Sequence, residues 1–179
     1  MQKITLTPKF LLRSNILIIG ILLILHLLSL QDYSTATDHW ATTIFTRLFN
    51  FDFEYNLPSA YSAANILITS ILCYTTSHLE KTGRDDKIKW KALSLICGFL
   101  AFDEYKGVHE RLSEPISLFL KQTEFINAHN GGEWVYAYSV LAILFCGIFW
   151  RLVINQDQKT RQLLITSFAI YITGLFVIR

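Results

Sequence analysis

The chain has 179 residues, of which 52% are hydrophobic and 17% charged, and its formal net charge is +2 at pH 7. Soluble domains carry about 25% charged residues, so this composition, with a mean hydropathy of +0.36 and apolar residues gathered in blocks, predicts a polytopic membrane protein. The apolar composition excludes a secreted disulfide scaffold and a disordered tail. A nucleic-acid-binding protein is also excluded, because the chain has too little net positive charge for an extended basic surface.

The apolar blocks are long enough to cross a membrane as helices. A bilayer core about 30 Å thick needs about 20 apolar residues in an α-helix. Five segments meet this requirement: residues 10–30, 60–78, 90–112, 134–154 and 163–178. We therefore predict an all-α fold in which residues 1–179 form one transmembrane helix bundle of about five spans. The sequence leaves open whether a sixth span follows Arg179.

The first block follows a basic N-terminal segment, so it must be compared with a cleaved signal peptide. Its apolar core exceeds the usual length of a signal peptide, contains His26, and ends before the small residues Ser34-Thr35-Ala36 that resemble a cleavage site. These features favour an uncleaved span.

Two further segments have apolar residues at helical spacing but do not span. These are residues 39–53, with Trp40, Ile44, Phe45, Leu48 and Phe49, and residues 115–126, with Ile116, Phe119 and Leu120. Such stripes suit a helix that lies in the membrane interface. We predict short amphipathic helices on the outer face, where simple capping of the bundle is the plainest role for both.

The third span carries charges where hydrocarbon is expected. Its apolar run, Ala92 to Phe102, is too short to cross a bilayer, and the helix must continue through residues 103–111, which read DEYKGVHER. Charges inside a span cost several kcal/mol each and persist where they pair, face water or do chemistry. In a continuous helix Asp103 and Glu110 share a stripe, whereas Glu104 and His109 lie on two other faces. A site here must therefore recruit other spans.

The face of Glu104 runs back through Ala101, Cys97 and Ser94, which resembles a seam of small residues for helix packing. A purely structural account of the charges is also open. Lys106 lies within one turn of Asp103 and Glu110, and Arg111 shares a face with Glu104, so that local pairs nearly neutralise the cluster.

Other spans bring titratable groups to the same depth. His26 lies about 18 Å into the first span, level with Asp103, which is about 20 Å beyond Trp90. We therefore predict that His26 contacts the third span near Asp103. The groups that converge on the outer half of the bundle are Asp103, Glu104, His109, Glu110, His26, His129 and Glu133.

Imidazole and carboxylate groups with an open position are the ligands of catalytic zinc and of non-haem iron or manganese. We predict a divalent metal site whose ligands are drawn from His109, Glu110, His26, His129 and Glu133. Asp103 and Glu104 are the predicted catalytic carboxylates, one acting as general base toward a metal-bound water. No HExxH, HxxxH or repeated ExxH pattern occurs, and Cys73, Cys97 and Cys146 lie in apolar blocks as predicted free thiols.

The segment Asp103-Glu104 to His109-Glu110 resembles the DExxxxHE helix end of small polytopic bacterial inner-membrane proteins of unknown function, which implies no activity. It is also similar to the membrane zinc hydrolases of the alkaline ceramidase and adiponectin-receptor group. Those proteins have seven spans and a paired-histidine motif that this chain lacks, so none of their functional residues is transferred to it.

The distribution of Lys and Arg predicts the orientation of the chain. With the N-terminus in the cytoplasm, eleven cations lie inside: Lys3, Lys9, Arg13, Lys81, Arg84, Lys87, Lys89, Lys91, Arg151, Lys159 and Arg161. Five lie outside: Arg47, Lys106, Arg111, Lys121 and Arg179. We predict a multi-pass protein of the cell inner membrane with a cytoplasmic N-terminus.

Three classes of function fit these observations. The first is a membrane-embedded hydrolase of a lipid or amphiphile, with an outward-facing metal site. The second is a non-enzymatic subunit or stabiliser of a larger membrane complex, in which another membrane protein covers the charged helix end. The third is proton or ion translocation, which ranks last because the helix face below Asp103 offers no relay to the cytoplasm.

Overall fold

The computed structural model describes residues 7–34, 40–79, 83–109, 111–112, 115–116, 118 and 134–177. The regular elements in this part of the chain are all helices: α1 (Pro8–Ser34), α2 (Trp40–Phe49), α3 (Leu57–Ser77), α4 (Arg84–Lys106), α6 (Trp134–Ile154) and α7 (Gln158–Val177). The predicted all-α fold is confirmed. Each of the five long helices overlaps one of the five predicted spans, with bounds that match for α6 and differ most for α4, and α2 lies within the first predicted amphipathic segment.

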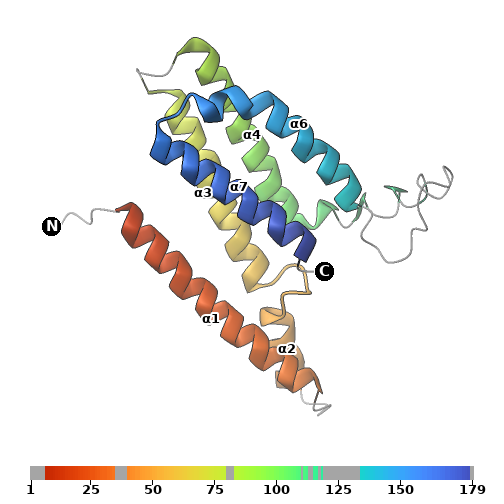
Figure 1. Ribbon diagram of the computed structural model, residues 1–179. Helices are drawn as coiled ribbons and strands as arrows, with labels where there is room; N and C mark the ends of the chain where they lie inside the picture. The colour runs from red at the N-terminus through yellow and green to blue at the C-terminus, as the bar shows by residue number, and fades with distance from the viewer. Residues whose placement is uncertain are drawn as a thin grey trace.

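The helices form two groups that meet at the start of α3 (Figure 1). The antiparallel pair α3 and α4 makes the most extensive helix contact, α6 contacts α4, α7 contacts α6, and α1 packs mainly on α2. The α1–α2 pair extends below the end of the α3–α4 pair in Figure 1. The segment between α2 and α3 therefore lies at the junction of the two groups.

Local capping fixes where two of the helices begin. Asn56 precedes α3 and accepts a hydrogen bond from the Ser59 backbone N–H at 2.9 Å, while the Asn56 N–H donates to Ser59 Oγ, which together make a capping box. Asp157 precedes α7 and accepts from the Thr160 backbone N–H at 3.1 Å. Hydrogen bonds from Thr160 hold the pKa of the exposed Asp157 carboxyl below its usual value.

Small side chains hold α3 against α4. Ser70 Oγ donates to the Ser94 carbonyl at 2.7 Å, and Ser94 Oγ donates to the Ser70 carbonyl at 2.8 Å. Ser70, Ser94 and Ala101 are all buried. The predicted seam of small residues on α4 is therefore confirmed, since close approach of two backbones requires small residues at the contact.

Ser70→Leu is expected to destabilise the protein by about 1–3 kcal/mol, because the larger side chain must displace α4 at its closest approach. A Cβ atom on Gly98 would already lie 3.4 Å from Ser70 Oγ, so this contact has no room for added atoms. Thr69→Leu, on the neighbouring exposed position, is the matched control. Thermal unfolding in detergent measures both, and equal midpoints for the two variants would contradict the description of the seam.

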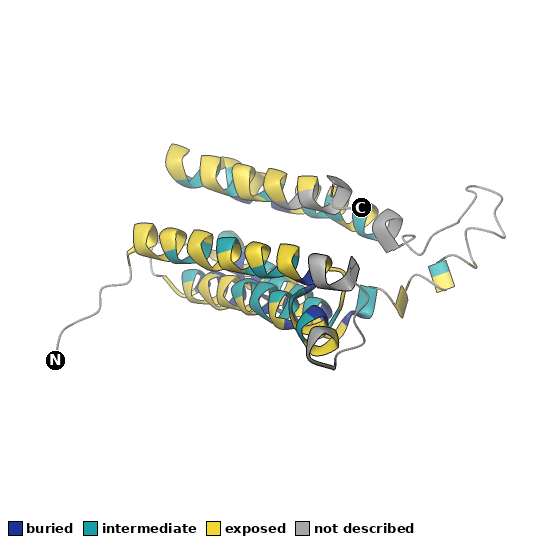
Figure 2. Ribbon diagram, turned by 90° about the horizontal axis from the view of Figure 1, so that it is seen from below, coloured by how far each residue is buried: buried dark blue, intermediate teal, exposed yellow. Residues whose placement is uncertain are grey.

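Two of the described helical stretches are long and apolar enough to cross a membrane, Pro8–Leu30 and Leu57–Ser77, and Tyr138–Ile154 is a shorter apolar helix. Their apolar side chains are not covered by the rest of the fold: none of the Pro8–Leu30 window and 17% of the Leu57–Ser77 window is buried. Figure 2 shows that exposed residues run along most of each helix. The helix most exposed in this way, α1, cannot be the core helix of a soluble domain.

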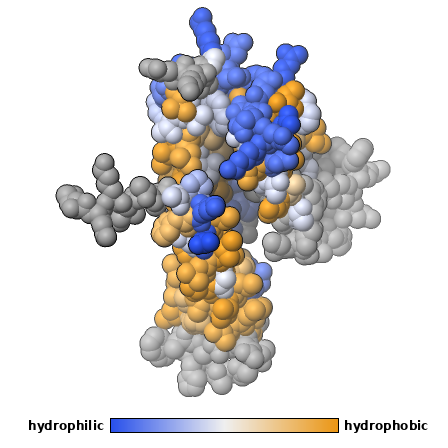
Figure 3. All heavy atoms as spheres, turned by 60° about the vertical axis from the view of Figure 1, so that its left-hand side comes forward, coloured by the Kyte–Doolittle hydropathy of each residue, from blue (hydrophilic) through white to orange (hydrophobic). Residues whose placement is uncertain are grey.

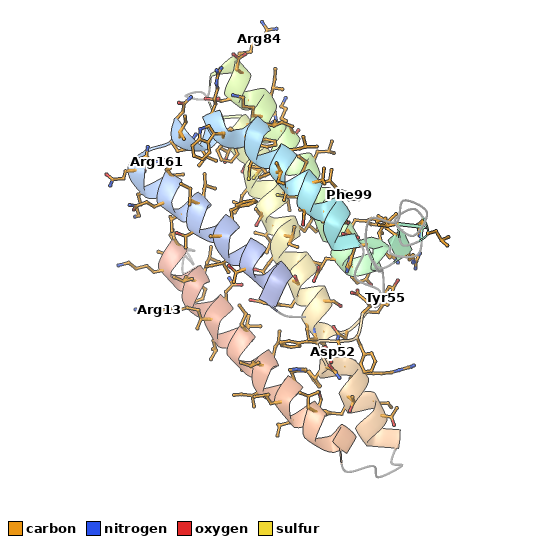
Figure 4. All side chains as sticks on the ribbon, turned by 45° about the vertical axis from the view of Figure 1, so that its right-hand side comes forward. Arg13, Asp52, Tyr55, Arg84, Phe99 and Arg161 are labelled. Atoms are coloured by element: carbon orange, nitrogen blue, oxygen red, sulfur yellow. The ribbon has the colours of Figure 1, made fainter. Side chains whose placement is uncertain are left out.

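Hydrophilic side chains gather at one end of the molecule and in a smaller patch about half-way down, with hydrophobic surface between and below them (Figure 3). Arg84, at the start of α4, and Arg161, in the first turns of α7, lie toward this end in Figure 4. α3 and α6 end there and α4 and α7 begin there. The fold thus brings together residues 83–91, at the start of α4, and residues 151–161, around the α6–α7 turn, which the sequence predicts on one side of a membrane.

Candidate functional site

α4 ends earlier than the third predicted span. Gly107 has φ 54° and ψ 41°, and its N–H donates to the Asp103 carbonyl, so it terminates the helix in a left-handed conformation. The continuous helix predicted for residues 90–112, with a stripe through Asp103, Gly107 and Glu110, is therefore wrong. The reason is local, since glycine adopts this conformation without the steric cost that a Cβ imposes.

This break folds the chain back onto the buried carboxylate of Asp103, which is only 4% exposed. Asp103 Oδ1 accepts the His109 backbone N–H at 2.7 Å and lies 3.2 Å from His109 Nδ1. Asp103 Oδ2 accepts the Tyr138 hydroxyl of α6 at 2.5 Å. Both carboxylate oxygens are thus hydrogen-bonded, as a buried carboxylate requires.

The opposite nitrogen of the His109 ring faces a second carboxylate. His109 Nε2 lies 3.8 Å from Glu54 Oε1, and the side chains of His109 and Glu54 are 15% and 23% exposed. Glu54 lies directly against the helix end, because a Cβ on Gly107 would be 3.4 Å from its carboxyl carbon. Asp103, His109, Glu54 and Tyr138, here called the His109 cluster, come from α4, the residues after it, the α2–α3 connection and α6.

Hydrogen bonds hold the connection between α2 and α3, which carries Glu54, in place. Asn56 Nδ2 donates to the Asn50 carbonyl at 2.5 Å, and Asn50 Oδ1 accepts the Asp52 N–H at 2.9 Å. Tyr55 has a positive φ of 59°, and its hydroxyl donates to the Lys106 carbonyl at 2.9 Å. In Figure 4 Tyr55 lies by the lower end of α4, and Asp52 lies toward α1 and α2.

The same connection separates His26 from the His109 cluster. His26 Nδ1 accepts the Phe51 backbone N–H at 3.2 Å, and the two rings stack with centroids 4.3 Å apart. Both oxygens of Asp103 are occupied by His109 and Tyr138. The predicted contact between His26 and Asp103 is therefore wrong, because α1 packs on α2 and on the connection rather than on α4.

Among the described residues, the predicted pairs Lys106–Asp103 and Arg111–Glu104 are also not formed. Arg111 Nη2 donates to the Tyr55 hydroxyl at 3.1 Å instead of lying on the face of Glu104, and Lys106 Nζ lies 5.3 Å from the centre of the Tyr105 ring. Glu104 is half-buried at the end of the small-residue seam and makes no ion pair with the described cations. Glu110, His129 and Glu133 lie outside the described residues.

The His109 cluster has the arrangement of a metal-binding histidine with its supporting carboxylate. In such sites one ring nitrogen donates to a carboxylate, which fixes the tautomer and raises the basicity of the other nitrogen, and that other nitrogen binds the metal. Here Asp103 can fill the supporting role, which leaves Nε2 beside Glu54. Two ligands with metal bonds of about 2.0–2.2 Å are about 3–4 Å apart. Within the described part of the chain no third His, Cys, Asp or Glu completes such a group.

Two members of the His109 cluster were not predicted from the sequence. Glu54 is one of two acidic residues in the aromatic run Phe51-Asp52-Phe53-Glu54-Tyr55, and its place beside an apolar segment was the available signal. Tyr138 lies near the start of the predicted fourth span, where a tyrosine is typical of a membrane-interface anchor, although a tyrosine near a buried acid is also a hydrogen-bond donor.

The fold and the cluster define a class: an all-α protein with helices long and apolar enough to cross a membrane, and a buried Asp–His–Tyr group at the end of one helix. The chain belongs to the family of a domain of unknown function, DUF8692, whose family model matches residues 16–177. No curated protein and no solved structure matches the chain significantly.

Proposed function

We propose that the chain is an integral membrane protein whose helices α1, α3, α4, α6 and α7 all cross the inner membrane, with the N-terminus in the cytoplasm. Two of these helices meet the length and hydropathy requirement by themselves. The support for the others is their exposed apolar side chains, among them Leu95, Ile143 and Ile170, which are 77%, 72% and 67% exposed. Apolar surface of this extent is stable when lipid covers it.

Cysteines placed at Asn155 and Asp52 are expected to react on opposite sides of the membrane. Both positions are exposed and lie in connections between helices, and the cation count places Asn155 inside and Asp52 outside. The measurement is labelling of intact cells with a membrane-impermeant maleimide, in a background without Cys73, Cys97 and Cys146. Labelling of position 155 in intact cells would overturn the orientation.

We further propose that this membrane protein binds a divalent metal through His109 Nε2 and Glu54 and hydrolyses an ester or amide of a lipid or amphiphile. The observation that carries the proposal is the orientation of His109, whose Nδ1 lies 3.2 Å from buried Asp103 while its Nε2 faces Glu54. Zinc, iron and manganese all accept this ligand chemistry. Glu110, His129 and Glu133 remain the predicted source of further ligands.

The residues of the cluster then have distinct roles. Asp103 holds the His109 ring in position and in the tautomer with its lone pair on Nε2, and Tyr138 fixes the Asp103 carboxylate. Asp103 is therefore a positioning residue in this proposal rather than the catalytic carboxylate predicted from the sequence. A metal held by His109 and Glu54 would lower the pKa of a water ligand, and a carboxylate that is not itself a ligand would accept the proton of that water.

Purified protein in detergent is expected to hydrolyse fluorogenic acyl-ester amphiphiles, to lose this activity with a chelator and to regain it with zinc. Glu54→Gln and His109→Ala are expected to be inactive. His78→Ala is the control, because His78 is exposed at the other end of α3 and contacts Tyr74. Activity that survives both cluster substitutions would reject the hydrolase. Absence of metal, together with co-purification of one defined membrane protein, would favour the role as a subunit.

A further inference from the structure

A second charged site lies at the opposite end of α4 from the His109 cluster. A pocket of about 440 Å³ opens where the start of α4 meets the end of α6. Its charged and polar lining consists of Arg84, Asp85, Asp86 and Lys89 from α4, and Arg151 and Asn155 from the end of α6. The lining therefore has a net charge of one positive unit.

The positive charge is concentrated on two arginines. Lys89 Nζ lies 3.8 Å from Asp86 Oδ1, so these two residues largely neutralise each other. The guanidinium groups of Arg84 and Arg151 make no ion pair with the described residues, and they approach the pocket from different helices. Arg84 and Arg151 line one pocket from different helices, and two guanidinium groups can bind the oxygens of a phosphodiester with paired hydrogen bonds.

The apolar surface beside the pocket argues for a lipid rather than a free anion. Trp150 precedes Arg151 and is 58% exposed, and Ile148 and Leu144, one and two turns earlier on α6, are 63% and 56% exposed. Tryptophan is typical of the headgroup level of a bilayer, and Ile148 and Leu144, which share the helix face of Arg151, can contact acyl chains below it. Basic pockets between helices on the cytoplasmic side of membrane proteins bind anionic headgroups for the same reason.

We propose that this pocket binds the headgroup of an anionic phospholipid, with its phosphodiester between Arg84 and Arg151 and its acyl chains along the exposed face of α6. The proposal rests on the membrane insertion proposed above and is independent of the metal and of hydrolysis. Asp85 repels an anion, so the affinity of the pocket for the headgroup depends on attraction by Arg84 and Arg151 and on repulsion by Asp85.

Quenching of tryptophan fluorescence by brominated lipids in detergent micelles tests the proposal. The protein carries Trp40→Phe and Trp134→Phe, so that the signal comes from Trp90 and Trp150, each adjacent in sequence to a residue of the pocket. Brominated phosphatidylglycerol is expected to quench at about tenfold lower lipid content than brominated phosphatidylcholine. The double variant Arg84→Gln/Arg151→Gln is expected to lose this preference.

Two single variants separate loss of binding from loss of folding. Arg161→Gln changes a cation on α7 that does not line the pocket and is expected to keep the preference. Asp85→Asn is expected to strengthen the preference for phosphatidylglycerol, a gain that a misfolded protein cannot show. A preference that survives the double variant, or that Arg161→Gln removes equally, overturns the proposal. If millimolar inorganic phosphate displaces the lipid, the pocket is a site for a soluble anion and the headgroup proposal is wrong. A failure of membrane insertion is detected separately, by the cysteine labelling.

Discussion

His109→Ala is expected to abolish high-affinity binding of zinc, and Asp103→Asn is expected to weaken it about 10–100-fold. The difference follows from the two roles: the first change removes the ligand itself, whereas the second removes the carboxylate that lies 3.2 Å from Nδ1 and orients the ring. Glu54→Gln is expected to lie between these extremes, since an amide oxygen still fits the site but carries no charge. Competition with a chromophoric chelator measures all three affinities.

His78→Ala is the matched control for this series, because it removes an exposed imidazole at the other end of α3. Its affinity for zinc should equal that of the unmodified protein. Asp103→Asn is the most informative variant. If it binds zinc as tightly as the unmodified protein while His109→Ala does not, the metal is bound without the support of Asp103, and the proposed geometry is incorrect.

Asp103→Ala is expected to lower the free energy of unfolding by about 3 kcal/mol in the presence of a chelator. The substitution removes the Asp103 carboxylate that accepts the His109 backbone N–H and the Tyr138 hydroxyl, in a region where Asp103 is only 4% exposed. Tyr138→Phe removes one hydrogen bond to a charged group and is expected to cost about half as much. Chemical unfolding in detergent micelles gives these values.

Asp52→Ala is the control for this series, because Asp52 is an exposed acidic residue in the connection between α2 and α3. It is expected to change the free energy of unfolding by about 0.5 kcal/mol or less. Similar losses for Asp52→Ala and Asp103→Ala would show that the buried hydrogen bonds of Asp103 contribute nothing to stability, contrary to the description given above.

The sequence predicted the helices well because apolar blocks of span length have few alternatives to a helix. Residues 134–154 were predicted with the bounds that α6 has in the structure, and the small-residue seam was predicted from Ser94, Cys97 and Ala101. The seam could be read from one helix alone, because small residues at helical spacing indicate a close contact whichever helix is the partner.

The candidate site was predicted less well, for a local and a long-range reason. Lys106 followed by Gly107 is typical of a helix end, but the demand for a span of full length favoured a continuous helix. Once the helix ends at Gly107, His109 reaches Asp103 within its own segment. The partner on the other ring nitrogen, Glu54, comes from a connection that no helical periodicity describes. Equal depth in the membrane favoured His26 as the partner of Asp103, but in the structure the His26 ring stacks on Phe51.

Elemental analysis of the protein, purified in detergent without chelators and without a histidine tag, tests the central claim most directly. The proposed site predicts about one zinc, iron or manganese ion per chain in the unmodified protein, and loss of this ion in His109→Ala but not in His78→Ala. An unmodified protein that contains no divalent metal even after reconstitution, or the same metal content in His109→Ala, would contradict it.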